Sequence, residues 1–159
     1  MLVGDELEEL AEELSQLWRE LGRTLTSRRM LASLQSGAPS PLTPTKLYAL
    51  DVLAETGERR IGELAERVGL DETSATRLVD RLEAAGIAER RDKAEDRRVT
   101  NVGLTAAGAE LAAKIGARRQ LFFCEVLGAL DPDERASLVR LTSKAAATLQ
   151  AKSVELASR

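Results

Sequence analysis

The sequence has no histidine, one cysteine and four aromatic residues among 159. Without histidine the chain lacks the commonest general base and metal ligand, which excludes histidine-based triads and zinc sites. Cys124 has no second cysteine for an internal disulfide. A site made of carboxylates alone remains as an alternative, but the acidic residues are mixed with basic ones at helical spacing, as on a solvated surface. We therefore expect no metal, no cofactor and no enzymatic activity.

Long apolar runs are also missing. No stretch approaches the about 18 apolar residues of a membrane span, and the first residues lack the basic and apolar regions of a signal peptide. The sequence thus predicts a cytoplasmic protein. Its 43% hydrophobic residues are enough for a buried core, and the scarcity of aromatic residues favours helices over β-sandwiches and barrels.

The net charge of −3 is unevenly distributed along the chain. Residues 1–20 contain seven acidic residues against Arg19 alone, so the rest of the chain carries a net charge of +3. Because the local field and not the total charge decides which partners bind, the acidic overall balance does not exclude DNA.

Residues 5–36 are predicted to form one long amphipathic helix. Its leucines recur at intervals of three and four residues: Leu7, Leu10, Leu14, Leu17 and Leu21. This stripe is larger than an isolated helix can cover, so it must pack on other helices or on a second chain. Gly37, Pro39 and Pro41 then predict a short linker.

Capping residues mark the starts of three further helices. Thr43 followed by Pro44 predicts a helix that ends before Gly57. Its predicted inner face consists of Leu47, Leu50 and Ala54. Thr105 is expected to cap a long helix, and the segment 131–134 has the Asp, Pro and Glu of an N-cap with a capping box before the last helix.

Two short amphipathic stretches predict a helix-turn-helix. Residues 61–68 and roughly 72–85 are separated only by Gly69, Leu70 and Asp71, of which Asp71 is a plausible N-cap. The predicted inner face of the second helix consists of Ala75, Leu78, Val79 and Leu82. Such a second helix can lie in the DNA major groove, although helical hairpins that bind no nucleic acid use similar turns.

Between residues 87 and 104 the apolar residues no longer follow helical spacing. Residues 87–91 and 98–104 can pair as strands around the polar segment 92–97, which predicts a β-hairpin wing. Within this wing, residues 90–98 contain five basic residues against three acidic ones, a net charge of +2 over nine residues.

The order of these motifs closely resembles the MarR (multiple antibiotic resistance regulator) family of transcription factors. The resemblance rests on the segment 77–83, on Gly86, on the Asp-Arg-Arg at 96–98 and on the Leu-Thr-Ala-Ala-Gly at 104–108. It extends in detail from about Leu42 to Gly108 and, in helix order, to both termini. It implies a mostly α fold with a small β-hairpin wing, in which a winged helix-turn-helix is flanked by dimerisation helices.

The resemblance also implies a division of the chain and a partner. Residues 1–42 would form a dimerisation helix and linker, 43–104 the DNA-binding winged helix-turn-helix, and 105–159 further dimerisation helices. A homodimer of this kind would place two recognition helices on a pseudopalindromic site in double-stranded DNA, with half-sites about 10 bp apart.

The outer face of the recognition helix contains the candidate DNA contacts. Thr73, Ser74 and Thr76 can contact base edges or phosphates, and Arg77 can pair with a guanine. Arg81 is better placed for a phosphate. The alternative is a solvated helix face, in which Arg81 forms a surface ion pair with nearby acidic residues such as Asp80, Glu83, Glu72 or Asp71.

In the wing, the family resemblance implies that Asp96 orients Arg98 for the minor groove. Lys93 and Arg97 are candidates for contacts with the DNA backbone. The alternative is a charged hairpin tip that contacts only water.

The resemblance further implies a small, often anionic aromatic effector that weakens DNA binding. Trp18 and Tyr48 are the aromatic candidates near its site, although packing in the core or an interface is the simpler explanation of both. Cys124 lies beside Phe122 and Phe123, so we expect a buried and inert thiol rather than a redox sensor.

The sequence therefore predicts a homodimeric, sequence-specific DNA-binding regulator of transcription, in particular a repressor released by an effector. Two alternatives remain: a helical dimer that uses its winged helix for protein contacts, and a cysteine-based redox regulator. The dependence of affinity on salt separates DNA binding from protein binding, because neutralised phosphates release counterions.

Overall fold

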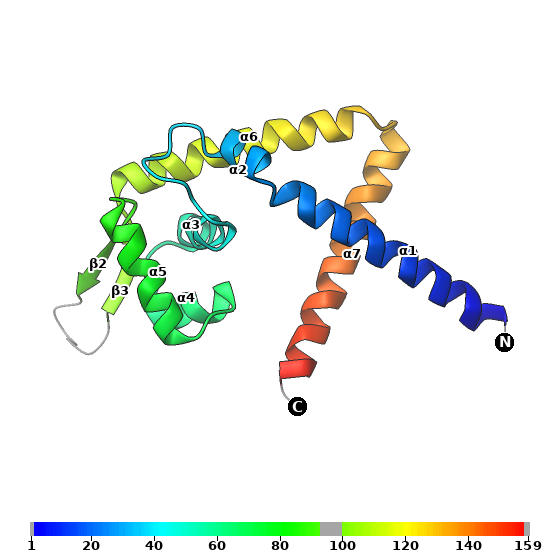
Figure 1. The fold of residues 1–159 in the computed structure, drawn as a ribbon, viewed down its shortest axis with the longest axis horizontal. Helices are drawn as coiled ribbons and strands as arrows, with labels where there is room; N and C mark the ends of the chain where they lie inside the picture. Colours follow the sequence, from blue (N-terminus) through cyan, green and yellow to red (C-terminus); the bar gives the residue numbers. More distant parts are fainter. Residues whose placement is uncertain (1, 93–99, 158–159) are drawn as a thin grey trace. The chain divides into compact units, whose positions relative to one another are not determined.

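The computed structural model describes residues 2–92 and 100–157. In this part of the chain the elements are α1 (Leu2–Leu25), α2 (Arg28–Leu34), α3 (Pro44–Thr56), β1 (Arg59–Arg60), α4 (Ile61–Val68), α5 (Glu72–Ala84), β2 (Ala88–Asp92), β3 (Thr100–Leu104), α6 (Ala106–Gly128) and α7 (Pro132–Ala157). The predicted fold class, mostly α with a small β-hairpin, is confirmed (Figure 1). Among the described helices, none has the length and apolar content needed to cross a membrane.

The prediction of one continuous helix over residues 5–36 is wrong, because the helix ends at Leu25 and restarts at Arg28. Ser27 has extended backbone angles, and its side chain accepts a hydrogen bond from the amide of Met30 at 3.3 Å. A residue that caps a new helix in this way cannot continue the previous one. The hydrogen bond to the serine hydroxyl therefore replaces the helical hydrogen bonding of the backbone at this position.

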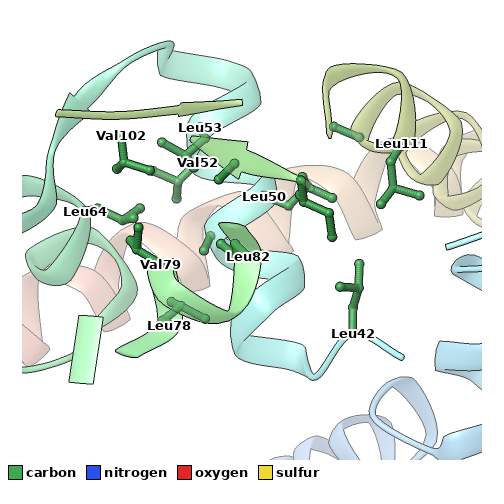
Figure 2. Close-up of a cluster of buried hydrophobic side chains, with 14 of the residues drawn as sticks. Leu42, Leu50, Val52, Leu53, Leu64, Leu78, Val79, Leu82, Val102 and Leu111 are labelled. Carbon is green, nitrogen blue, oxygen red and sulfur yellow. The ribbon is translucent and has the colours of Figure 1, made fainter. Parts of the chain in front are cut away.

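The hydrophobic core lies among α3, α4, α5, the sheet and the first half of α6 (Figure 2). Its largest fully buried side chains are Leu50, Leu64, Leu82, Ile87, Ile115, Val79 and Val102. The prediction for α3 is wrong in one residue. Ala54 is exposed, and Ala49, Val52 and Leu53 are buried with Leu50, because α3 contacts both α4 and β3 and so buries a broader face than the three-residue stripe predicted.

The helix-turn-helix forms as predicted from α4 and α5. Gly69 ends α4 in the left-handed conformation (φ 70°), where the amide of Leu70 bonds to the carbonyl of Ala65 at 2.9 Å. Asp71 caps α5. The four residues predicted to face inward on α5, from Ala75 to Leu82, are all buried.

The predicted hairpin is confirmed in the described strands. β2 and β3 pair antiparallel from Ala88 opposite Leu104 to Asp92 opposite Thr100. The strand β1 was not predicted, because two residues carry no readable alternation. It pairs with β3 on the other side, so β3 is the central strand of the sheet.

A close backbone contact joins the start of α6 to the turn between α5 and β2. The hydroxyl of Thr105 lies 2.6 Å from the carbonyl oxygen of Gly86 and accepts the amide of Gly108 at 3.0 Å, as expected of an N-cap. The amide of Thr105 bonds to the carbonyl of Ile87 at 3.0 Å. A Cβ on Gly108 would lie 1.9 Å from that same carbonyl oxygen, so only glycine fits.

The chain divides into two compact units, residues 1–117 and 118–159. The second unit contains the end of α6 and α7. The predicted capping box is confirmed there, since Asp131 accepts the amide of Glu134 and the carboxylate of Glu134 accepts the amide of Asp131, both at 2.9 Å.

Large apolar side chains are exposed on α1, α6 and α7 in the single chain. No residue from 118 to 155 is buried. The exposed group on α6 and α7 comprises Leu121, Phe123, Val126, Leu138, Val139, Leu141, Leu149 and Val154. The expectation of a buried Cys124 is wrong, because the thiol is exposed, and Phe122 and Phe123 pack edge to face on each other with ring centroids 5.3 Å apart.

Replacing Gly108 tests the contact with Ile87. We expect Gly108→Ala to lower the free energy of unfolding by about 3 kcal/mol, because the methyl group meets a backbone oxygen that hydrogen bonds hold in place. Gly116→Ala in the same helix meets no atom within 4 Å, and we expect it to stabilise the chain by roughly 0.5–1 kcal/mol. Urea denaturation followed by circular dichroism measures both, and equal midpoints for the two variants would contradict the account.

Candidate nucleic-acid interface

The outer face of α5 carries three exposed polar residues that were predicted to contact DNA: Thr73, Arg77 and Arg81. Arg77 and Arg81 are four residues apart, so they lie on the same side of the helix. The opposite side of α5 is fixed in the core by Ala75, Leu78, Val79 and Leu82. The packing of α5 therefore determines which residues it presents outward.

The other two hydroxyls of α5 are half-buried and bonded within the helix. Ser74 donates its hydroxyl to the carboxylate of Asp71 at 2.6 Å, and its amide donates to the same group at 2.8 Å. Thr76 donates its hydroxyl to the carbonyl of Glu72 at 2.9 Å. Both side chains keep only acceptor capacity for a ligand.

Arg77 and Arg81 have no carboxylate partner among the described residues. Arg81 donates to the carbonyl of Arg77 at 3.2 Å instead. The alternative in which Arg81 pairs with Asp80 or Glu83 is not formed, because both of those carboxylates bind Arg90 on β2. Two positive charges on the outer face of α5 are therefore not neutralised by the described part of the chain.

Arg90 links the strand β2 to the helix α5. Its guanidinium bonds to Asp80 at 2.6 Å and also to Glu83, and its amide donates to Glu83 at 2.7 Å. The hydrogen bond to Asp80 is the main cause that raises the pKa of Arg90 above its usual value. From the sequence, Arg90 was predicted only as one of the charged residues of the wing. The spacing of Asp80 and Glu83 on one side of a helix was the signal that could have revealed its partners.

Arg91, the next residue of β2, bonds to residues that lie outside α5. It bonds to Glu89 at 2.6 Å and to Glu58 at 3.4 Å, while Asn101 donates to Glu58 at 2.8 Å. Successive residues of a strand point to opposite faces, which explains why neighbouring arginines have different partners. The hydrogen bond to Glu89 is the main cause that raises the pKa of Arg91.

The remaining predicted contacts, Lys93, Asp96, Arg97 and Arg98, lie outside the described residues. In the described part of the hairpin, Arg90 and Arg91 both bond to carboxylates. The positive charge that this hairpin can offer to DNA therefore depends on residues 93–98.

A surface hollow of about 510 Å³ lies between α2 and the loop that follows it. Leu31, Ala32 and Leu42 contribute apolar walls, and Arg28 contributes a positive charge. The buried amide of Gln35 bonds to both the carbonyl (2.7 Å) and the amide (2.5 Å) of Leu42, which holds the loop against α2. Trp18 and Tyr48 do not line this hollow, and both are about half-exposed.

Part of the chain is similar to a known protein family and to named regulators. The profile described as "MarR family" matches residues 40–99. The regulator YcgE of Bacillus subtilis is 41% identical over 100 residues, 62% of each chain, and the repressor MdtR of the same species is 29% identical over 71% of this chain and 73% of its own. The chain thus spans about six-tenths of the length of YcgE.

Solved structures share the fold over most of the chain. A MarR family protein from Bacillus stearothermophilus superposes with a TM-score of 0.75 at 27% identity, covering 90% of this chain and 97% of its own. YcgE and MdtR are named as regulators and not as enzymes, in agreement with the expectation that this chain is not an enzyme.

Asp71 gives a pH-dependent test of how α5 is capped. The hydrogen bonds from Ser74 lower the pKa of the Asp71 carboxyl, so its stabilisation is fully present above the unfolded pKa of about 3.9 and is lost as the pH falls through the folded value. We expect Asp71→Ala to lower the thermal midpoint at pH 7, and Asp71→Asn to restore most of the loss because its oxygen still accepts.

Thermal melts across pH 2–8 measure this contribution. The midpoint difference between the wild type and Asp71→Asn is expected to shrink in acid. A difference that grows as the pH falls would mean that the carboxylate does not stabilise the helix.

Proposed function

We propose that the chain is a regulator of transcription of the MarR family, to whose profile residues 40–99 are similar, and that it binds double-stranded DNA with its α5 helix. The observation that carries this proposal is the outer face of α5, where Thr73, Arg77 and Arg81 are exposed while the neighbouring carboxylates are bound to Arg90. An exposed row of arginines on the second helix of a helix-turn-helix has the chemistry to bind the major groove.

Each exposed or half-buried polar side chain on the outer side of α5 has a proposed role. Arg77 would pair with a guanine edge and Arg81 with a phosphate, while Thr73 would donate to a base or phosphate. Ser74 and Thr76 would act as acceptors, because their hydroxyl protons are already bonded. In the wing, Lys93 and Arg97 would contact the backbone, and Asp96 would orient Arg98 for the minor groove.

We propose that residues 43–104 form the DNA-binding part and that residues 1–42 and 105–159 supply dimerisation helices. The support is apolar surface that the single chain leaves exposed on α1, α6 and α7. A second copy of the chain is the proposed occupant of these faces. The resulting twofold symmetry implies a pseudopalindromic site with half-sites about 10 bp apart.

Repression and release by an effector complete the proposed function. The named repressor MdtR is the relative that favours repression. The hollow beside α2 is a candidate effector site, since its apolar walls and Arg28 suit a small anionic aromatic compound. A regulator of this kind would act in the cytoplasm, where it meets chromosomal DNA.

Selection of binding sites from a random duplex library tests DNA recognition. We expect enrichment of a palindrome with half-sites about 10 bp apart. On that duplex, Arg77→Ala is expected to weaken binding by about 1–3 kcal/mol and to relax one base position, and Arg81→Ala to reduce the slope of log affinity against log salt by about one.

Arg140→Ala is the matched control, because it removes the same charge from the exposed surface of α7. No enrichment with folded dimeric protein, or equal losses for Arg77→Ala and Arg140→Ala, would count against the proposal and favour protein contacts.

Dimerisation has its own test on α1. We expect Leu14→Glu to shift the protein from dimer to monomer in sedimentation and to weaken DNA binding, because a charge replaces an apolar side chain that the second copy covers. Gln16→Glu adds the same charge outside the leucine stripe and is expected to remain dimeric. A wild-type protein that sediments as a monomer at micromolar concentration would refute this part of the proposal.

A further inference from the structure

We propose that Arg90 is a positioning residue for DNA recognition, which holds the wing strand β2 in a fixed register on α5 without touching the DNA. This inference rests on the proposed function and adds a determinant of affinity outside the contact surface. The contacts that carry it join Arg90 to two carboxylates on α5, at positions three residues apart.

The geometry fixes β2 in more than one direction. The amide of Arg90 donates to Glu83 at 2.7 Å, which anchors the strand backbone. The guanidinium bonds to Glu83 and, at 2.6 Å, to Asp80, one helical turn earlier. A planar fork held by two carboxylates resists both sliding and rotation of the strand along the helix, which a single ion pair does not.

The position of β2 on α5 also fixes the position of β3. β2 pairs with β3 over five residues, so a shift of β2 carries β3 with it. Residues 93–99 connect the two strands and include the proposed wing contacts. The position of β2 and β3 relative to the outer face of α5 therefore depends on where Arg90 holds the strand.

Two observations argue against a direct DNA contact by Arg90. Its guanidinium is already bonded to two carboxylates, and its side chain is only 31% exposed. Arg77 and Arg81 differ in both respects, since they are exposed and have no described carboxylate partner. Arg90 thus has its effect through α5 and β2.

Arg91 provides a matched control on the same strand. Arg91→Met removes the same charge and also breaks ion pairs, but these lead to Glu58 and Glu89 and not to α5. A loss caused by general weakening of the wing would be similar in Arg90→Met and Arg91→Met. A loss caused by the link to α5 would be larger in Arg90→Met.

The experiment measures affinity and salt dependence for the full-length chain on the duplex enriched by the wild type. We expect Arg90→Met to weaken binding about tenfold and Arg91→Met less than threefold, with the salt slope unchanged in both. Asp80→Asn with Glu83→Gln is expected to weaken binding by a similar factor to Arg90→Met, although it removes two negative charges. The triple variant combines Arg90→Met with Asp80→Asn and Glu83→Gln. It is expected to bind no more weakly than Arg90→Met alone, because the arginine and the carboxylate substitutions break the same link between β2 and α5.

Three results would overturn the inference. A salt slope reduced by about one in Arg90→Met would mean a lost phosphate contact. Unchanged or tighter binding by Asp80→Asn with Glu83→Gln would mean that Arg90 only neutralises the two carboxylates. If the triple variant lost affinity by the product of the two separate factors, Arg90 would act independently of Asp80 and Glu83.

Thermal melts and the variant Arg90→Lys are the controls for a loss of folding. Lysine keeps the positive charge but lacks the rigid planar fork of arginine, so we expect intermediate affinity with a wild-type thermal midpoint. Failure of the wild type to bind any selected duplex would refute the proposed function itself. Wild-type binding with no effect of the Arg90 variants would refute only the role of Arg90.

Discussion

The contact between Gly108 and the carbonyl of Ile87 is the constraint on which the rest of the winged helix depends. It allows the hydroxyl of Thr105 to bond at the Gly86 carbonyl and to cap α6, so that three elements meet at one short turn. α5 ends at this turn, β2 begins there and α6 starts beside it. With its C-terminal end fixed by this turn, its N-terminus capped by Asp71 and one side buried in the core, α5 has a single outer face. The arginines on that face owe their exposure to this packing rather than to any local preference.

Electrostatics explains why an acidic chain can present a basic surface. The net charge is −3, yet seven acidic residues within positions 1–20 account for more than this total. The four arginines of α5 and β2 divide into two pairs: Arg90 and Arg91 bond to carboxylates, while Arg77 and Arg81 have no described carboxylate partner. Because the carboxylates of Asp80 and Glu83 are bound to Arg90, these two residues repel a phosphate backbone less than the sequence of α5 alone would suggest.

Sequence periodicity and capping predicted the elements that depend on local interactions. Asp71, Thr105 and the capping box at 131–134 start helices as expected, and the buried side of α5 follows the predicted stripe. Features that depend on competition or on distant partners were not predictable. Ser27 can sit within a helix or cap one, and the sequence does not decide between these. The strand β1 exists only because β3 offers it a partner, and Arg90 could be assigned to Asp80 and Glu83 only after the hairpin was placed. Cys124 is exposed because a single chain does not cover the end of α6.

The central claim is that the outer face of α5 is the surface that reads DNA, held by the turn at Ile87 and by Arg90. Amide hydrogen exchange of the full chain, with and without an excess of the selected duplex, tests this claim most directly. The account predicts slower exchange in the first two turns of α5 and in β2 when the duplex is bound, because contact with DNA suppresses local opening of these segments. Exchange in α7 is predicted to be unchanged at equal dimer occupancy. Unaltered exchange throughout α5 under conditions where all of the protein is bound would contradict the account.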